Sequence, residues 1–276
     1  MKQNDIMNSF LSCLREDSDE YQSLKFPNTT EEQKTLIRSL MNIRMPKAIP
    51  EKLLHAQNLY LQEESALKGT IPLSEIPTVR ETYNSSHPFA DRISIWQGDI
   101  TRLCTGAIVN AANSQMLGCF VPCHRCIDNA IHSAAGLQLR EECNHIMNRK
   151  RIQYGRQYEE PVGTAILTDS YNLPCDHVIH TVGPIVHNGL TESLRQDLRN
   201  CYESVLNCCM DNGIASVAFC CISTGEFHFP NEEAATIAVE TVTNFLTSHA
   251  DCGIYRILFN VFKDTDKTIY EKILGH

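Results

Sequence analysis

The most reactive side chains of the sequence lie in one stretch, between an apolar run ending near residue 110 and a helix-like run beginning near residue 127. Cys119, His124 and Cys126 fall within eight positions there, and thiolate and imidazole are ligands that Zn²⁺ prefers. Cys123 is a fourth candidate, although its place directly before His124 makes simultaneous coordination awkward. The spacing favours a metal site over unmetallated thiols. It leaves open whether zinc keeps a free position for water or substrate, or is closed by four protein ligands.

Asn113 and Asp128 flank this stretch and are the candidate catalytic residues. An asparagine amide can both donate to and accept from a sugar hydroxyl, and a carboxylate can orient a nucleophilic water. A purely structural interpretation is open as well, in which Asn113 caps the following turn and Asp128 caps the following helix.

Two further segments follow apolar runs and offer groups for a nucleotide. Asp99, in Gly98-Asp99-Ile100-Thr101, can accept a hydrogen bond from an exocyclic amine such as that of adenine. The segment Ser223–Phe227 places small hydroxyl residues around a glycine, so its backbone N–H groups can approach a phosphate closely. Considered alone, each segment is better explained as an ordinary turn. His180 lies in a hydrophobic run and is expected to be a hydrogen-bonded core histidine rather than a ligand.

From residue 91 onwards, short apolar strands alternate with amphipathic helices, which predicts a largely parallel sheet between two layers of helices. Ligands of such sheets bind beyond the carboxyl ends of the strands. The expected strands are Arg92–Trp96, Ala107–Asn110, Thr164–Thr168, His177–Thr181, Ser216–Ile222 and Tyr255–Val261. The expected helices are Ile127–Asn148, Leu190–Asn212, Asn231–Ser248 and Asp264–Leu274.

Residues 1–90 are expected to form a helical extension and linker, and residues 91–276 the main domain. Apolar residues recur at helical spacing in the extension, and Thr30 with Gln33 predicts a capping box at the start of one helix. Residues 70–90 contain Pro72, Pro77 and Pro88 and are expected to connect the two parts.

The composition excludes some classes of function. The chain of 276 residues has a net charge of −9, which argues against nucleic-acid binding, since that needs a basic face. No stretch resembles a signal peptide or a membrane span. The thirteen cysteines are not spaced as a disulfide framework, so we expect a cytoplasmic protein with reduced thiols.

Four short motifs, in this order and spacing, together resemble the macrodomain family of ADP-ribose-binding proteins. They are Gly98-Asp99-Ile100-Thr101, Ile108-Val-Asn-Ala-Ala-Asn113, His180-Thr-Val-Gly-Pro184 and Ile222-Ser-Thr-Gly225. The resemblance implies a three-layer α/β/α fold with a mixed, largely parallel sheet. The insertion between Met116 and Asn129, together with an N-terminal helical extension, is similar to a narrower class, the zinc-containing microbial macrodomains that act as protein-ADP-ribose hydrolases.

The resemblance also implies roles for individual residues. Asp99 and Ile100 would contact adenine, Asn113 would hold the distal ribose, and Ile127 and Asp128 would lie against the ligand. Zinc would be bound by Cys119, His124 and Cys126, and Cys126 would also border the substrate. The diphosphate and distal ribose would be wrapped by Ser223, Thr224, Gly225, Glu226 and Phe227.

The activity implied by this resemblance is zinc-dependent removal of ADP-ribose from mono-ADP-ribosylated proteins, with an ester to an aspartate or glutamate as the expected linkage. The implied partners are a sirtuin-like ADP-ribosyltransferase and a lipoyl-carrier protein, with no nucleic acid and no membrane. Two alternatives are a non-catalytic module that binds ADP-ribose and uses zinc only to shape its loop, and a purely structural zinc protein that binds no ADP-ribose.

Overall fold

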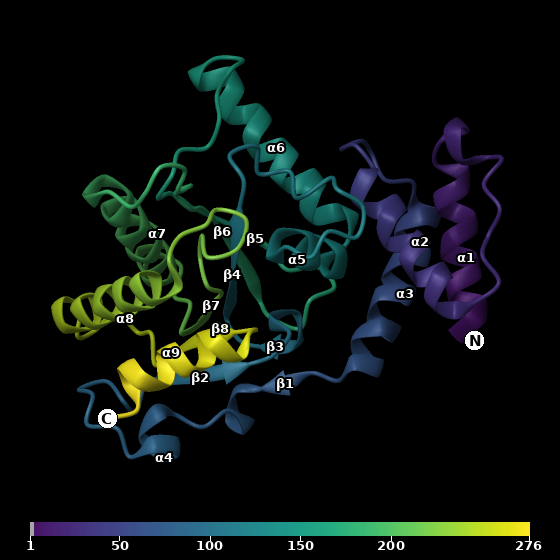
Figure 1. The fold of residues 1–276 in the computed structure, drawn as a ribbon. Helices are drawn as coiled ribbons and strands as arrows, with labels where there is room; N and C mark the ends of the chain where they lie inside the picture. Colours follow the sequence, from purple (N-terminus) through teal and green to yellow (C-terminus); the bar gives the residue numbers. More distant parts are fainter. Residues whose placement is uncertain (1–2) are drawn as a thin grey trace.

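The computed structural model describes residues 3–276, and within them the core is a six-stranded sheet. The strand order is β2-β8-β7-β4-β6-β5, and all neighbours are parallel except β5 and β6 (Figure 1). The strands are β2 (Ile93–Gln97), β4 (Ala107–Ala112), β5 (Ala165–Asp169), β6 (His177–Val182), β7 (Ser216–Phe219) and β8 (Arg256–Val261). Since both faces are covered, β4, β7 and β8 consist almost entirely of buried residues.

Helices cover both faces of the sheet, which confirms the expected three-layer α/β/α architecture with an N-terminal helical extension. One layer contains α5 (Ile127–Ala135) and α6 (Leu137–Tyr154). The other contains α7 (Glu192–Asp211), α8 (Asn231–Ser248) and α9 (Asp264–Leu274) (Figure 1). No helix within residues 3–276 has both the length and the apolar character needed to cross a membrane.

The single helix expected over residues 127–148 is wrong, because the chain breaks it at Gly136. That residue has φ of +104°, a conformation that side-chain-bearing residues rarely adopt, and it ends α5 and precedes α6. Gln57 of the extension accepts a hydrogen bond at 2.8 Å from the backbone N–H of Leu137, which satisfies a free donor at the start of α6.

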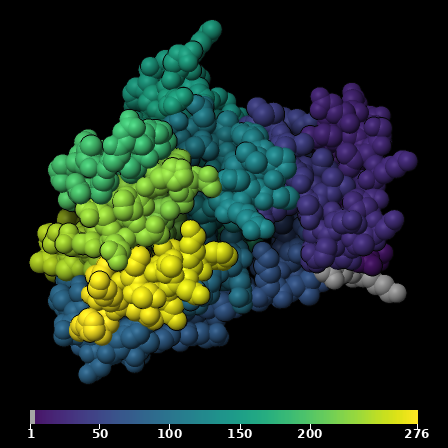
Figure 2. Space-filling model, viewed as in Figure 1, coloured from purple at the N-terminus to yellow at the C-terminus, as the bar shows by residue number. Residues whose placement is uncertain are grey.

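The extension has a hydrophobic core of its own and lies against one side of the main domain (Figure 2). It consists of α1 (Gln3–Glu16), the short 3₁₀ turn Asp19–Tyr21, α2 (Thr30–Ile43) and α3 (Glu51–Lys68). Phe10 and Tyr60 pack in that core with ring centroids 5.4 Å apart. The N-cap of α2 is Thr29, whose hydroxyl accepts from the Glu32 N–H at 3.3 Å, so the N-cap expected at Thr30 was placed one residue too late.

Residues 70–90, expected to connect the two parts, contain regular secondary structure. Strand β1 (Ile71–Pro72) pairs in parallel with β3 (Leu103–Cys104), and α4 (Val79–Tyr83) follows a 3₁₀ turn at Leu73–Glu75. Ile76, Val79 and Ala90 are buried in the core of the main domain. This segment therefore packs with the main domain. The division into residues 1–90 and 91–276 stays a prediction.

The extension core gives a direct stability prediction. Replacing the fully buried Phe10 by alanine should lower the free energy of unfolding by about 3–5 kcal/mol, because it leaves a cavity among packed side chains. Urea unfolding followed by circular dichroism measures the change, and Ser9→Ala at an exposed position of the same helix is the control. A loss below about 1 kcal/mol, as for a surface substitution, would contradict this packing.

Candidate active site

The cysteine and histidine loop leaves the carboxyl end of β4 and returns at the start of α5. It turns through Met116 and Gly118, which have φ of +63° and +77°. A Cβ atom on Gly118 would lie 2.8 Å from Cγ of His132, so only glycine fits this close approach. Cys126 is the N-cap of α5, and its Sγ accepts from the Asn129 N–H at 3.4 Å. The cap is thus Cys126 and not Asp128, so the capping role considered for that carboxylate is wrong.

Cys119, His124 and Cys126 form a compact candidate metal centre. Their ligand atoms all lie within 4.8 Å of one another, and all three residues are half-buried. Nδ1 of His124 is buried and has no hydrogen-bond partner among the described residues, while Nε2 lies 3.7 Å from Oε1 of Glu226. Burial raises the pKa of the Cys126 thiol to about 12, so a thiolate here needs a cation beside it. Two sulfurs and an imidazole nitrogen in this arrangement fit zinc.

Cys123 points away from this cluster and towards α2. Its Sγ lies 3.2 Å from the Ser39 hydroxyl and 3.4 Å from the Thr35 carbonyl, and its backbone N–H donates to Asn42 at 2.9 Å. The backbone of Cys123 is left-handed, with φ of +53°, and this conformation directs its side chain away from Cys119, His124 and Cys126. This geometry favours three protein ligands and an open fourth position over a closed four-ligand site.

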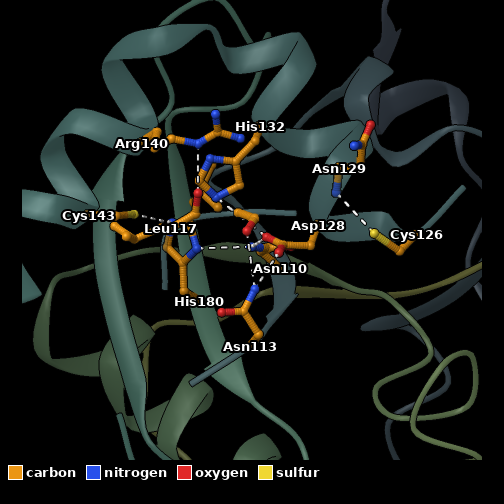
Figure 3. Close-up of polar contacts among 12 residues, drawn as sticks. Asn110, Asn113, Leu117, Cys126, Asp128, Asn129, His132, Arg140, Cys143 and His180 are labelled. Atoms are coloured by element: carbon orange, nitrogen blue, oxygen red, sulfur yellow. Dashed lines mark hydrogen bonds and ion pairs between the residues drawn. The ribbon is translucent and has the colours of Figure 1, made fainter. Parts of the chain in front are cut away.

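Asp128 is buried immediately behind the loop and is held by two asparagines of the β4 segment (Figure 3). Its Oδ1 accepts from Asn110 at 2.8 Å, and its Oδ2 accepts from Asn113 at 3.3 Å. Burial raises the pKa of Asp128 to about 6, and the Asn110 hydrogen bond is the strongest effect in the opposite direction. Asn113 also caps its own turn, donating to the Gly118 carbonyl at 3.2 Å and accepting from the Gln115 N–H at 3.0 Å. Asn113 therefore has the turn-capping role considered for it, and its role towards a sugar stays a prediction.

Two buried histidines lie beside Asp128 and its partner Asn110. His132 has Nε2 at 3.4 Å from Oδ1 of Asp128. His180 contacts Asn110 through Nδ1 at 3.0 Å and Thr168 through Nε2 at 3.0 Å, as expected for a hydrogen-bonded core histidine (Figure 3). Burial lowers the pKa of His180 to about 3, so its ring stays neutral at physiological pH. Asn110 was not singled out from the sequence, although a polar residue inside an apolar strand was a signal for it.

Asp99 lies where β2 ends, beside the end of β8. Its Oδ1 accepts from the N–H and hydroxyl of Thr101 at 3.0 and 2.6 Å, and its Oδ2 lies 3.6 Å from Nζ of Lys68. The side chain of Ile100 is buried, so only its backbone is available to a ligand. Phe262, 77 % exposed, follows the Gln97–Val261 pair of β2 and β8 and so lies at the same sheet edge. Sequence reasoning missed this aromatic, whose signal was its place directly after a buried strand.

The segment Ser223–Phe227 forms the remaining wall, between β7 and α8. Ser223 is left-handed with φ of +65°, and its buried hydroxyl has no hydrogen-bond partner within the described part of the chain. A Cβ atom on Gly183 would lie 2.1 Å from that hydroxyl, so the loop after β6 approaches this turn closely. Gly225 and Glu226 are exposed, while Phe227 is half-buried and its carbonyl accepts from the Val186 N–H at 2.9 Å. That the backbone N–H groups of this segment bind a phosphate stays a prediction.

Comparison with known proteins places this fold in a family. A family model described as "Macro domain" matches residues 109–238. A Trypanosoma brucei macrodomain, whose structure was solved with ADP-ribose, matches with a TM-score of 0.63 and 27% identity, over 85% of this chain and 94% of that one. An Oceanobacillus iheyensis macrodomain variant solved with ADPR matches with a TM-score of 0.59 and 36% identity, over 67% and 94%.

Full-length relatives support the same assignment. A Treponema medium protein named "Protein-ADP-ribose hydrolase" is 43% identical over 265 residues, which is 96% of both chains. A Fusarium oxysporum protein named "Probable bifunctional ADP-ribose hydrolase/ADP-ribosyltransferase" is 42% identical over 250 residues, 87% of this chain but 40% of its own length. The chain belongs to the macro domain family.

The position of Cys123 gives a prediction about the metal. Replacing Cys126 or His124 by alanine should abolish zinc binding, because each removes one of three ligands. Cys123→Ala should keep the metal, because that thiol faces α2. Metal content of the purified variants, measured by inductively coupled plasma mass spectrometry, tests both. Loss of zinc from Cys123→Ala would instead indicate a four-ligand structural site.

Proposed function

We propose that this macro domain protein is a zinc-dependent hydrolase that removes ADP-ribose from mono-ADP-ribosylated protein side chains. The observation that carries the proposal is the position of the Cys119, His124 and Cys126 cluster. It lies in the loop whose two ends carry Asn113 and Asp128, with Cys123 turned away. The name "Protein-ADP-ribose hydrolase" of the Treponema medium relative supports the activity.

The walls of the site would hold the nucleotide so that only the distal ribose reaches the loop. Asp99 would accept from the adenine amino group, Phe262 would stack on its ring, and the backbone of Ile100 would border it. The N–H groups of Ser223–Phe227 would bind the diphosphate in front of α8. Binding at these points would hold the bond between ADP-ribose and the protein side chain next to the catalytic groups.

The groups around the distal ribose would then carry the chemistry. Asn113 would orient the ribose, and the buried carboxylate of Asp128, fixed by Asn110, would orient and deprotonate the attacking water. When bound to Cys119, His124 and Cys126, zinc supplies a Lewis acid and lowers the pKa of a bound water. Ile127 and Cys126 would line the side of the ribose nearest α5.

The proposal extends to the substrate and its source. An ester to aspartate or glutamate, on a lipoyl-carrier protein, is the proposed linkage, and a sirtuin-like ADP-ribosyltransferase is the proposed source of the modification. The Fusarium oxysporum relative, whose name joins hydrolase and transferase, supports such a pairing. The proposed location is the cytoplasm, where the thirteen cysteines, free in this structure, stay reduced.

Release of the modification tests the activity. Incubated with a mono-ADP-ribosylated protein, the zinc-loaded chain should release ADP-ribose, and a chelator should stop the release until zinc is added back. Asp128→Asn should bind ADP-ribose and lower kcat by about 10²-fold or more, since it removes the base but keeps the shape. Tight ADP-ribose binding without release would instead assign the alternative function, a reader module with structural zinc.

The adenine position has its own test. Asp99→Ala should weaken ADP-ribose binding by about 10- to 100-fold, the cost of one hydrogen bond to a charged group, and leave the metal in place. Calorimetric titration measures the affinity, and Asp91→Ala, at an exposed carboxylate near the same strand, is the matched control. Unchanged affinity in Asp99→Ala would place the adenine elsewhere.

A further inference from the structure

Helix α2 of the extension contacts the candidate metal loop directly. The guanidinium of Arg38 donates to the His124 carbonyl at 3.2 Å. It also donates twice to Oδ1 of Asn129, through Nη2 at 2.7 Å and Nε at 3.0 Å. One side chain of the extension thus binds the backbone of a candidate metal ligand and a residue of α5 at the same time.

Asn129 relays this contact to a second ligand. It is fully buried, its backbone N–H donates to Sγ of Cys126 at 3.4 Å, and its Nδ2 donates to the Val121 carbonyl at 3.1 Å. Arg38 therefore reaches His124 through its carbonyl and Cys126 through Asn129. Hydrogen-bond partners behind metal ligands fix the orientation of those ligands.

Hydrogen bonds add to the packing of α2 against α5. A cavity of about 240 Å³ lies beside Arg38, and its lining includes Ile37 and Met41 of α2 and Ala130 and Ala134 of α5. Asn42 adds a second polar contact, accepting from the Cys123 N–H and donating to the Ser133 hydroxyl, both at 2.9 Å. Together with the contacts of Arg38, these hydrogen bonds join the loop and the start of α5 to α2.

We propose that Arg38 is a positioning residue of the metal centre, so that the helical extension is part of the construction of the site. The inference rests on the proposed function, because it needs a metal at Cys119, His124 and Cys126. By holding the His124 carbonyl and Asn129 together, Arg38 sets the distance between the imidazole and the Cys126 thiolate. Without it, the loop keeps its ligands but loses their spacing.

Cobalt binding by the full chain tests this inference without relying on activity. Co²⁺ replaces zinc and gives thiolate charge-transfer and ligand-field absorption, which report affinity and geometry together. Arg38→Met should weaken Co²⁺ binding by about 10- to 100-fold, as expected for a partner behind the ligands, and should alter the ligand-field bands. Arg38→Lys should recover part of the affinity, because a single ammonium cannot span both acceptors as the guanidinium does.

The matched control is Lys34→Met on the same helix. Lys34 lines the same cavity but pairs with Glu64 of α3 at 2.9 Å, within the extension. Lys34→Met should therefore bind Co²⁺ within about fivefold of the unmodified chain, because the ion pair that it removes lies within the extension. Thermal unfolding of each variant monitors the fold.

Three results would overturn the inference. The inference is wrong if Arg38→Met folds and binds Co²⁺ as the unmodified chain does. If Arg38→Met does not fold, the inference is also wrong if Arg38→Lys has the same Co²⁺ affinity and the same absorption bands as the unmodified chain. If the unmodified chain binds no Co²⁺, the metal proposal fails and the inference fails with it. Absent hydrolysis with intact Co²⁺ binding contradicts only the proposed function.

Discussion

The buried carboxylate of Asp128 is the constraint around which the site is built. A buried carboxylate is stable only with hydrogen-bond partners, and both of its asparagine partners come from the end of β4. These hydrogen bonds join the first turn of α5 to the carboxyl end of β4. They therefore hold the two ends of the intervening loop close together. The side chains of the loop, including all three candidate ligands, can then occupy only a small volume beside that carboxylate. The closeness of the three candidate ligands to the Asn113–Asp128 pair therefore follows from this closure of the loop.

The parallel order of the sheet brings together the other segments of the candidate site. Strands β2, β4, β6 and β7 run in the same direction, so the segments that follow them emerge at one edge. Asp99, Asn113, Gly183 and Ser223 are far apart in the sequence but all follow these strand ends. This explains why four short motifs, each weak alone, together predicted a nucleotide site. Alternation of apolar strands and amphipathic helices predicted the sandwich, since that pattern reflects which faces are buried.

What the sequence did not reveal are contacts between distant segments. Arg38 and Asn129 are separated by 91 positions, and no periodicity relates them. The direction of Cys123 depends on one left-handed backbone residue and on the nearness of α2, so spacing alone left its role open. The break at Gly136 was missed because apolar spacing continues across it, while the deciding partner, Gln57, lies in the extension. Local sequence patterns predict helices and strands. The contact of Arg38, the direction of Cys123 and the helix break at Gly136 depend instead on how the extension packs.

The most direct test is a crystal structure of the chain with ADP-ribose, with anomalous data collected on both sides of the zinc edge. The account predicts a zinc peak about 2.3 Å from the sulfurs of Cys119 and Cys126 and about 2.0 Å from a nitrogen of His124. The distal ribose should lie at the fourth position, between the metal and the Asn113–Asp128 pair. A zinc whose fourth ligand is Cys123, or ADP-ribose bound with its distal ribose away from the loop, would contradict it.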